Sequence, residues 1–391
     1  MRVPIFHGLT PLDLIRPVRS EASCFPFNAP HRHYFYRARN AIYYLFRALR
    51  STTGPLLVLV PDYNSGNEVL AMQQAGATIQ YCPVGRDMQL DPAEVERLCR
   101  IHRPDVLYVI HYAGWPQPMP ALVDICERRH MLLVEDCALA LFSEVDGRPL
   151  GSFGDWSIFC LYKTLPLPNG AVLVHNTTTA LKPLERLRLR QPGAASVIGR
   201  SAELFVQRLR GRVETVGSVL QMMKRGLGRT ATALDVHRAN VGDIGFNLVD
   251  VDVAMSAMSA RLLERLDFDV IRRRRIENFR LMSERLDRHV ARALPDPGEG
   301  VCPLFFPILV PDKRAAVEAL KPAGVEALEF WNDSVEPGGA EMSEDARFLR
   351  AHVLELPVHQ DLTSRQVAYM AEQVSRLNLR TSNASHRIHA A

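Results

Sequence analysis

The chain lacks the features that mark membrane proteins, disulfide scaffolds and disordered proteins. No apolar run in its 391 residues approaches the roughly 18 residues that span a bilayer. The 7 cysteines include no C-x-x-C pair, and an odd count without metal-ligand spacing is typical of a reducing compartment. The first residues, Met1–Ile5, do not resemble a signal peptide. Hydrophobic residues at 47% and charged residues at 23% are in globular proportions, so we expect a cytoplasmic protein of about two or three domains.

Lysine is scarce in this chain. Of the 47 basic residues only 5 are Lys, and the other 42 are Arg. A Lys amine can lose its proton and act as a nucleophile, whereas an Arg guanidinium stays charged. Each Lys is therefore more informative than usual. Lys163 is the first of them, and the next, Lys182, is predicted to lie in a helix.

The basic excess is concentrated in one segment. The formal net charge is +4, but between Thr177 and Asn240 twelve basic residues face four acidic ones, which leaves the remainder of the chain at −4. This segment could be a subunit-interface or lid insertion, a site for an anionic substrate, a peripheral membrane contact through residues 200–230, or a solvated Arg-rich face. No motif supports nucleic-acid binding, and no residues are predicted to hold a metal.

The hydrophobic pattern predicts an α/β fold with a mostly parallel sheet. Short apolar runs alternate with helical patterns, as a parallel sheet covered on both faces requires. We expect an N-terminal segment over 1–35, a large domain over 36–250 with a basic helical insertion at 178–240, a long helix at 251–286 leading into a small C-terminal α/β domain that ends at 378, and a flexible tail over 379–391. The predicted strands are 55–60, 78–84, 106–111, 131–135, 156–162, 171–175 and 302–310.

Three polar residues stand where predicted strands end, namely His111, Asp136 and Lys163. Open parallel sheets bind ligands beyond the C-terminal ends of their strands. An acid and a Lys at that rim suit pyridoxal phosphate (PLP) chemistry, in which the amine forms a Schiff base and the carboxylate keeps the pyridine nitrogen protonated. Taken singly, each residue has a simpler explanation, because the acid could cap a helix, the Lys could be a surface charge, and His111 could be structural.

Five ordered motifs then resemble one family, the DegT/DnrJ/StrS-type PLP-dependent sugar aminotransferases. The resemblance extends over about residues 36 to 378. It implies the large PLP-dependent transferase fold (fold type I) with a smaller C-terminal domain. The motifs are residues 109–116 (VIHYAGWP), 133–138 (LVEDCA), 147–155 (GRPLGSFGD), 245–248 (GFNL) and 356–363 (LPVHQDLT).

The resemblance also implies roles for particular residues. Lys163 would hold PLP as a Schiff base, Asp136 would face the pyridine nitrogen, and Asn247 would reach the phosphate bound by the partner subunit of a homodimer. The implied reaction moves an amino group from an amino acid, commonly glutamate, to a nucleotide-linked keto-sugar, for surface polysaccharide or amino-sugar biosynthesis. His111 would lie near the cofactor as a hydrogen-bonding residue.

Several positions depart from the family pattern. Leu139 replaces a Gln that contacts the cofactor, Cys160 stands where a phosphate-binding Ser is usual, and Lys163 comes about two residues early. In place of the usual phosphate loop, Arg39 and Asn40 are candidates either for phosphate contacts at a helix N-terminus or for packing.

Two further departures affect the pocket and the interpretation. Tyr63 is a candidate for the substrate or cofactor pocket, because the aromatic residue expected to stack on the cofactor ring is missing. Val249 replaces the Arg that follows the Asn247 motif. These changes leave two alternatives open: a non-catalytic or regulatory homologue, and a PLP enzyme of another reaction type such as a sugar dehydratase.

Overall fold

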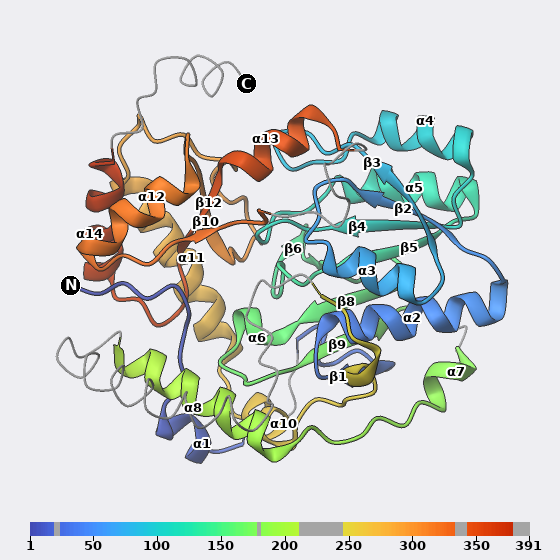
Figure 1. Cartoon of the computed structure of the whole chain (residues 1–391), viewed down its shortest axis with the longest axis horizontal. Coiled ribbons are helices and arrows are strands. Elements are labelled where there is room, and N and C mark those ends of the chain that lie inside the picture. Colours follow the sequence, from blue (N-terminus) through green and yellow to red (C-terminus); the bar gives the residue numbers. More distant parts are fainter. Residues whose placement is uncertain (19–23, 178–180, 211–244, 333–341, 378–391) are drawn as a thin grey trace.

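The computed structural model describes residues 1–18, 24–177, 181–210, 245–332 and 342–377. Within them, the chain builds a large domain around a seven-stranded sheet and a small domain around a three-stranded sheet (Figure 1). Helix α11 (Phe268–Arg285) runs between the two (Figure 1). The predicted tail 379–391 and residues 211–240 of the predicted insertion lie outside the described residues.

The large sheet has the strand order β1-β9-β8-β5-β4-β2-β3. Strands β2, β3, β4, β5 and β8 run parallel to their neighbours in this group, β9 lies antiparallel to β8, and β1 lies antiparallel to β9. This confirms the mostly parallel sheet. The strands of this domain are β1 (Arg32–Phe35), β2 (Leu57–Pro61), β3 (Thr78–Cys82), β4 (Val106–Ile110), β5 (Leu132–Asp136), β8 (Trp156–Cys160) and β9 (Ala171–His175), with a separate hairpin of β6 (Glu144–Val145) and β7 (Arg148–Pro149).

Strand β1 is not predicted by the sequence pattern, which places it inside the N-terminal segment 1–35. It pairs Arg32 with Val174 and Phe35 with Ala171 at the edge of the sheet. Only Phe35 is fully buried in this strand. An edge strand that is partly exposed needs no continuous apolar run, so its sequence carries little strand signal.

The helices of the large domain begin where the sequence offers capping residues. For example, Asp91 accepts a hydrogen bond from the backbone N–H of Ala93, and Pro92 occupies the first position of α4. Helix α2 packs on β8 and β9, whereas α4 and α5 pack against each other. The helices are α1 (Pro11–Ile15), α2 (Ala38–Thr53), α3 (Asn67–Gln74), α4 (Pro92–His102), α5 (Met119–Arg129) and the one-turn α6 (Leu161–Thr164).

The small domain is an antiparallel sheet with helices, which confirms the predicted C-terminal α/β unit. Its strand order is β10-β12-β11, so β12 is the central strand. Helix α14 packs against α11 and ties this sheet to the rest of the chain. The elements are β10 (Phe305–Leu309), α12 (Lys313–Leu320), η3 (Lys321–Ala323), β11 (Leu328–Glu329), α13 (Glu344–His352), β12 (Val353–Pro357) and α14 (Ser364–Ser375).

The single long helix predicted over 251–286 is wrong. The chain instead forms η2 (Leu248–Asp250), α10 (Ala257–Leu263) and α11. The side chains of Ser256 and Asp267 accept hydrogen bonds from the N–H groups of Ser259 and Val270, so each starts a new helix. The apolar periodicity continues through this region, but the two capping side chains determine where each helix begins.

The basic segment after β9 contains helices α7 (Lys182–Glu185) and α8 (Ala194–Arg210), as far as it is described. Helix α8 packs beside the N-terminal residues, where the N–H of Leu9 donates to the carbonyl of Leu204 at 3.2 Å. Arg208 forms an ion pair with Asp361. Among the helices described, none is long and apolar enough to cross a membrane.

Candidate active site

Asp136 ends β5, between β4 and β8 in the middle of the large sheet. The Tyr108 hydroxyl donates to its Oδ2 at 2.6 Å, and the N–H of Ala138 donates to Oδ1 at 2.8 Å. Burial raises the pKa of Asp136, while these two donors and the nearby Lys163 oppose the rise. Tyr108 and Ala138 therefore hold a buried carboxylate, whose remaining lone pairs can accept a further N–H donor.

Lys163 lies on α6, one turn after the end of β8, and not at the end of a longer strand as the sequence predicted. The turn is fixed at its last carbonyl, because Arg275 Nη2 and Gln360 Nε2 both donate to Thr164 O at 3.2 Å. Within the described residues, the Lys163 amine makes no hydrogen bond and no ion pair, and its side chain is half-buried. The backbone is thus held firmly and the amine is left available.

The Lys163 amine lowers the pKa of three acidic groups around it. These groups are Asp136 of β5, Cys160 of β8 and Glu355 of β12, and in each case burial acts in the opposite direction and dominates. The pKa of Glu355 rises to about 7. Lys163 therefore lies among acids from both domains. Glu355 was missed in the sequence, because an acid between two leucines in a strand has no distinctive pattern.

The N-terminus of α2 faces the same rim. Its N-cap residue, Arg37, makes no side-chain capping hydrogen bond. Burial lowers the pKa of Arg39, and Tyr162 of α6 and Cys160 at the end of β8 oppose this shift, so the guanidinium lies near both. Arg39 also donates to the carbonyl of Gly245. An uncapped helix N-terminus with two Arg residues is suited to binding an anion.

Asn40, the other candidate for phosphate contacts, is buried and uses its amide elsewhere. Its Nδ2 donates to the carbonyls of Asp250 and Val251 at 2.9 and 3.0 Å. It thereby ties η2 to α2. This arrangement corresponds to the packing role, one of the two open alternatives for this residue.

Cys160 is the last residue of β8 and is fully enclosed. Burial raises the pKa of its thiol, and Lys163 and the hydrogen bond with Tyr162 oppose the rise. Leu139, the other replaced cofactor contact, is buried as well. Both positions therefore present small or apolar groups where the resembling family offers hydrogen-bonding ones.

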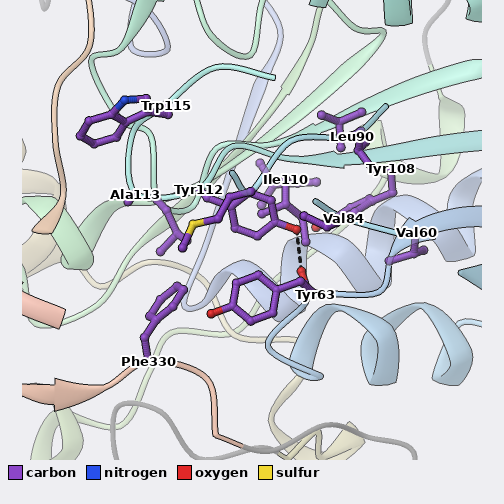
Figure 2. Close-up of a cluster of buried hydrophobic side chains, with 14 of the residues drawn as sticks. Val60, Tyr63, Val84, Leu90, Tyr108, Ile110, Tyr112, Ala113, Trp115 and Phe330 are labelled. Atoms are coloured by element: carbon purple, nitrogen blue, oxygen red, sulfur yellow. Dashed lines mark hydrogen bonds between the residues drawn. The ribbon is translucent and has the colours of Figure 1, made fainter. Parts of the chain in front are cut away.

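Tyr63 lies in a cluster of buried hydrophobic side chains, together with Tyr112 and Phe330 (Figure 2). It stacks with Tyr112 at a centroid distance of 5.6 Å and contacts Phe330 and Trp331 of the small domain edge-on. The Tyr112 hydroxyl donates to the backbone carbonyl of Tyr63 at 2.6 Å (Figure 2). The hydroxyl of Tyr63 is buried and has no hydrogen-bond partner among the described residues. Tyr63 therefore joins the two domains.

His111 is fully buried and hydrogen-bonded within the protein. Its Nε2 contacts Glu135 Oε2 at 3.1 Å, and the N–H of Gln117 donates to Nδ1 at 3.2 Å. His111, Glu135 and Cys137 offer ligand atoms within 4.8 Å of one another. However, Glu135 also accepts three backbone N–H groups, from residues 151, 153 and 154. These hydrogen bonds satisfy the polar atoms of His111 and Glu135, so the two residues form a structural network.

Asn247 is exposed and directly precedes η2, which Asn40 ties to α2. Its Oδ1 accepts from the N–H of Val249 at 2.9 Å and caps η2. Leu248 and Val249 beside it are 47% and 75% exposed. Among the described residues, the Asn247 side chain therefore has this one hydrogen bond, to the backbone of its own turn.

The sheet, the buried Asp136 and the available Lys163 amine define a PLP-dependent transferase of fold type I. The chain belongs to the DegT/DnrJ/EryC1/StrS aminotransferase family, which it matches over residues 40–375. The family assignment agrees with the resemblance found in the motifs. Aminotransferases of this family use PLP as their cofactor.

Individual relatives are distant from this chain. GDP-perosamine synthase of Vibrio cholerae is 28% identical over 151 residues, which make up 38% of this chain and 41% of that protein. Helicobacter pylori PseC, an aminotransferase of pseudoaminic acid biosynthesis, superimposes with a TM-score of 0.63 at 16% identity, over 88% of this chain and 86% of PseC. A Streptococcus pneumoniae protein in its PLP form gives a TM-score of 0.67 at 15% identity, over 99% and 100% of the two chains.

The similarity to GDP-perosamine synthase covers part of each chain, and the similarity to the two solved structures is one of fold. The chain aligns with less than half of the length of GDP-perosamine synthase. At 15–16% identity, the two solved structures show the fold alone.

The residues at the rim fit PLP. The Asp136 carboxylate can accept a hydrogen bond from a pyridine N–H, the Lys163 amine can bond to an aldehyde, and α2 offers an uncapped N-terminus with Arg37 and Arg39 for a phosphate. Leu139 offers no hydrogen bond to the phenolic oxygen of the cofactor. The residues present therefore fit three groups of PLP, namely its pyridine nitrogen, its aldehyde and its phosphate.

Proposed function

We propose that this chain is a PLP-dependent aminotransferase. It would transfer an amino group from an amino acid, glutamate in the first instance, to a nucleotide-linked keto-sugar in the biosynthesis of amino sugars or surface polysaccharide. The observation that carries this proposal is the Lys163 amine, which has no hydrogen bond or ion pair within the described part of the chain, near the buried Asp136 carboxylate. The name of the relative GDP-perosamine synthase supports a nucleotide-linked acceptor.

Each residue at the rim has a definite task in this proposal. PLP, when bound, supplies the electron sink for the substrate carbon that loses its proton. Asp136 holds a proton at the pyridine nitrogen, and Tyr108 keeps that carboxylate oriented. The Lys163 amine attaches the cofactor and then carries a proton to and from the substrate. The α2 N-terminus with Arg39 binds the phosphate.

The proposal includes a homodimer in the cytoplasm. Asn247 and the exposed Leu248 and Val249 form a surface beside α2 that a second copy could cover, which would bring Asn247 to the partner's cofactor phosphate. All seven cysteines are free, in keeping with a reducing compartment. Sedimentation or light scattering of the purified chain with and without PLP would test the assembly.

The cofactor test uses the purified chain and added PLP. The wild type should become yellow, and borohydride reduction should fix one cofactor on the peptide that contains Lys163. Lys163→Ala should lose both signals, whereas Lys182→Ala, which changes an exposed Lys of α7, should keep them. Glutamate should then convert bound PLP to pyridoxamine phosphate, observed as loss of the yellow absorption.

Two outcomes would redirect the proposal. A colourless wild type in excess PLP would exclude the enzyme and favour the non-catalytic homologue. Stable yellow colour with every amino donor tried would exclude the aminotransferase and favour another PLP reaction. A panel of GDP-, dTDP- and UDP-linked keto-sugars would identify the acceptor by recovery of the yellow form from the pyridoxamine form.

A further inference from the structure

Arg275 is among the largest fully buried side chains of the protein, and it lies in the middle of α11 with 1% exposure. Burial lowers its pKa to about 10, so the guanidinium stays charged at neutral pH. Among the described residues, no carboxylate forms an ion pair with it, and its donors reach the backbone carbonyls of Thr164, Pro303 and Leu304 at 3.2, 3.4 and 2.9 Å. A buried charge without an acid partner costs free energy, so the packing of α11 does not account for this residue.

The bond from Arg275 to Thr164 is made at the turn that presents Lys163. Thr164 is the last residue of α6, and its carbonyl oxygen accepts from Arg275 Nη2 and from Gln360 Nε2, both at 3.2 Å. A helix of one turn leaves most of its backbone carbonyls without an internal partner and is not stable by itself. The turn therefore depends on two donors from outside it, one from α11 and one from the segment after β12.

The same face of α11 also sets the position of the second donor. Asn278 lies three residues after Arg275 and is equally buried, and residues at this spacing lie on one side of a helix. Its Nδ2 donates to the carbonyls of Val358 and His359 at 3.4 and 2.9 Å, and these residues directly precede Gln360. Helix α11 thus holds the turn directly through Arg275 and a second time through the segment that carries Gln360.

The guanidinium of Arg275 is fixed on its other side as well. Its Nη1 donates to the carbonyls of Pro303 and Leu304, just before β10. The N–H of Leu304 in turn donates to the carbonyl of Ala113, just after β4, at 2.8 Å. Strand β4 pairs with β5, which ends at Asp136. Arg275 therefore holds the α6 turn in a constant position relative to the strand ends at which Asp136 lies.

We infer that Arg275 is a positioning residue for Lys163, a buried guanidinium that fixes the α6 turn so that the amine meets the rim in one orientation. The inference deepens the proposed function and rests on it. Arg275 acts on the amine through the carbonyl of Thr164. Attachment of PLP requires the amine and the aldehyde to be closely aligned, and a displacement of about 1 Å can slow such a reaction by about 100-fold. Loss of the Arg275 donor should therefore slow attachment even where the fold is kept.

The first test needs neither cofactor nor activity, because it follows the turn itself. The N–H of Leu165 donates to the carbonyl of Leu161 at 2.8 Å and closes α6, so its hydrogen exchange, measured by NMR, reports local opening of the turn. In Arg275→Met we expect this N–H to exchange about tenfold faster or more, relative to the N–H groups of β5, because a hydrogen bond from a charged donor is lost. Gln360→Met removes the second donor and should act in the same direction to a smaller degree.

The matched control for this test is Arg272→Met, one turn earlier on the same helix. Arg272 Nη2 donates to Glu144 Oε1 at 2.7 Å, and among the described residues Arg272 has no hydrogen bond with α6. The control should therefore leave exchange of the Leu165 N–H as in the wild type. Equal exchange in Arg275→Met and the wild type would overturn the inference. If Arg275→Met does not fold, Gln360→Met decides by the same criterion.

The second test follows attachment of PLP to Lys163 by visible absorption after mixing, at equal amounts of folded protein. In Arg275→Met we expect attachment to slow by about tenfold or more and the circular dichroism band of the bound cofactor, which reports how its ring is oriented, to weaken. Arg275→Lys keeps one donor and should restore part of both signals. Because Arg275 and Gln360 share one acceptor, combining Arg275→Met with Gln360→Met should slow attachment by more than the product of the two single effects. Arg272→Met should behave as the wild type.

The results separate this inference from the proposed function. If the wild type attaches PLP and Arg275→Met matches it in rate and in the dichroism band, the positioning role is refuted and the aminotransferase proposal stands. If the wild type attaches no PLP, the proposed function fails, and exchange of the Leu165 N–H decides whether Arg275 fixes the turn. A variant that is less stable but leaves both readouts unchanged would show that Arg275 has a structural role alone, which would also refute the inference.

Discussion

Replacing Glu355 by Gln in the PLP-free chain should stabilise the fold, and the gain should grow with pH. The folded state raises the pKa of Glu355 from an ordinary 4.5 to about 7, so it binds this proton more tightly than the unfolded chain does. No penalty exists below pH 4.5, where both states are protonated. The penalty grows between pH 4.5 and 7 and is complete above 7.

The size of the gain follows from the shift. At 1.36 kcal/mol per pH unit, the rise from 4.5 to about 7 corresponds to about 3 kcal/mol. Because Glu355 is half-buried and not sealed from solvent, we expect about half of this, roughly 1–2 kcal/mol at pH 8. Urea unfolding of wild type and variant at pH 4, 6 and 8, followed by tryptophan fluorescence, would measure it.

The prediction is tested by how the stability difference between Glu355→Gln and the wild type changes with pH. Glu329→Gln, also in the small sheet, should show no such trend, since its carboxylate accepts a hydrogen bond from Asn332 at 2.7 Å near the surface. A Glu355→Gln variant that is equally stable relative to wild type at pH 4 and pH 8 would refute the reasoning. So would a variant that is less stable at pH 8, because the carboxylate would then stabilise the fold in its charged form.

Two further predictions concern the rim and the backbone around it. Tyr108→Phe removes the donor to Asp136 and should raise the PLP dissociation constant by about tenfold in an absorption titration, as expected for a hydrogen bond to a charged group; an unchanged affinity would contradict the proposed role of that bond. Gly114→Ala should lower the free energy of unfolding by several kcal/mol, because Gly114 has φ +110° and a Cβ there would lie 2.4 Å from the Cys302 carbonyl oxygen. Gly147→Ala, with φ +76° and open space, should cost only about 1 kcal/mol, and equal losses at both positions would exclude the clash.

The sequence predicts the parts of the fold that correspond to continuous runs of apolar residues. The buried strands of the large sheet are apolar runs, and the rim acid Asp136 follows one of them. The helix division near residue 267 was missed, because the apolar spacing continues across it while the Asp267 cap acts locally. The position of Lys163 on α6 was missed for a similar reason, since Leu161 and Tyr162 extend the apolar run of β8 beyond the last paired residue, Cys160.

The parts of the site that the sequence could not predict depend on contacts between distant segments. In the sequence, Asn40 is a polar residue near the start of a helix. In the structure, its amide donates to the backbone carbonyls of Asp250 and Val251. Tyr63 is an aromatic residue after a strand, and only the packing of Phe330 shows that it belongs to the interface between the domains. Hydrogen-bond donors and rings can be satisfied by any suitable neighbour, so their partners follow from the tertiary fold.

The same dependence on distant contacts makes the Lys163 turn a junction between the domains. Its last carbonyl is held by Arg275 from α11 and by Gln360 from the segment after β12, and its amine lies between Asp136 of the large domain and Glu355 of the small one. A displacement of the small domain would therefore move the backbone of the turn and change the charge around the amine together. Binding of a substrate between the domains would then change which acids lie near the amine, since Asp136 belongs to the large domain and Glu355 to the small one.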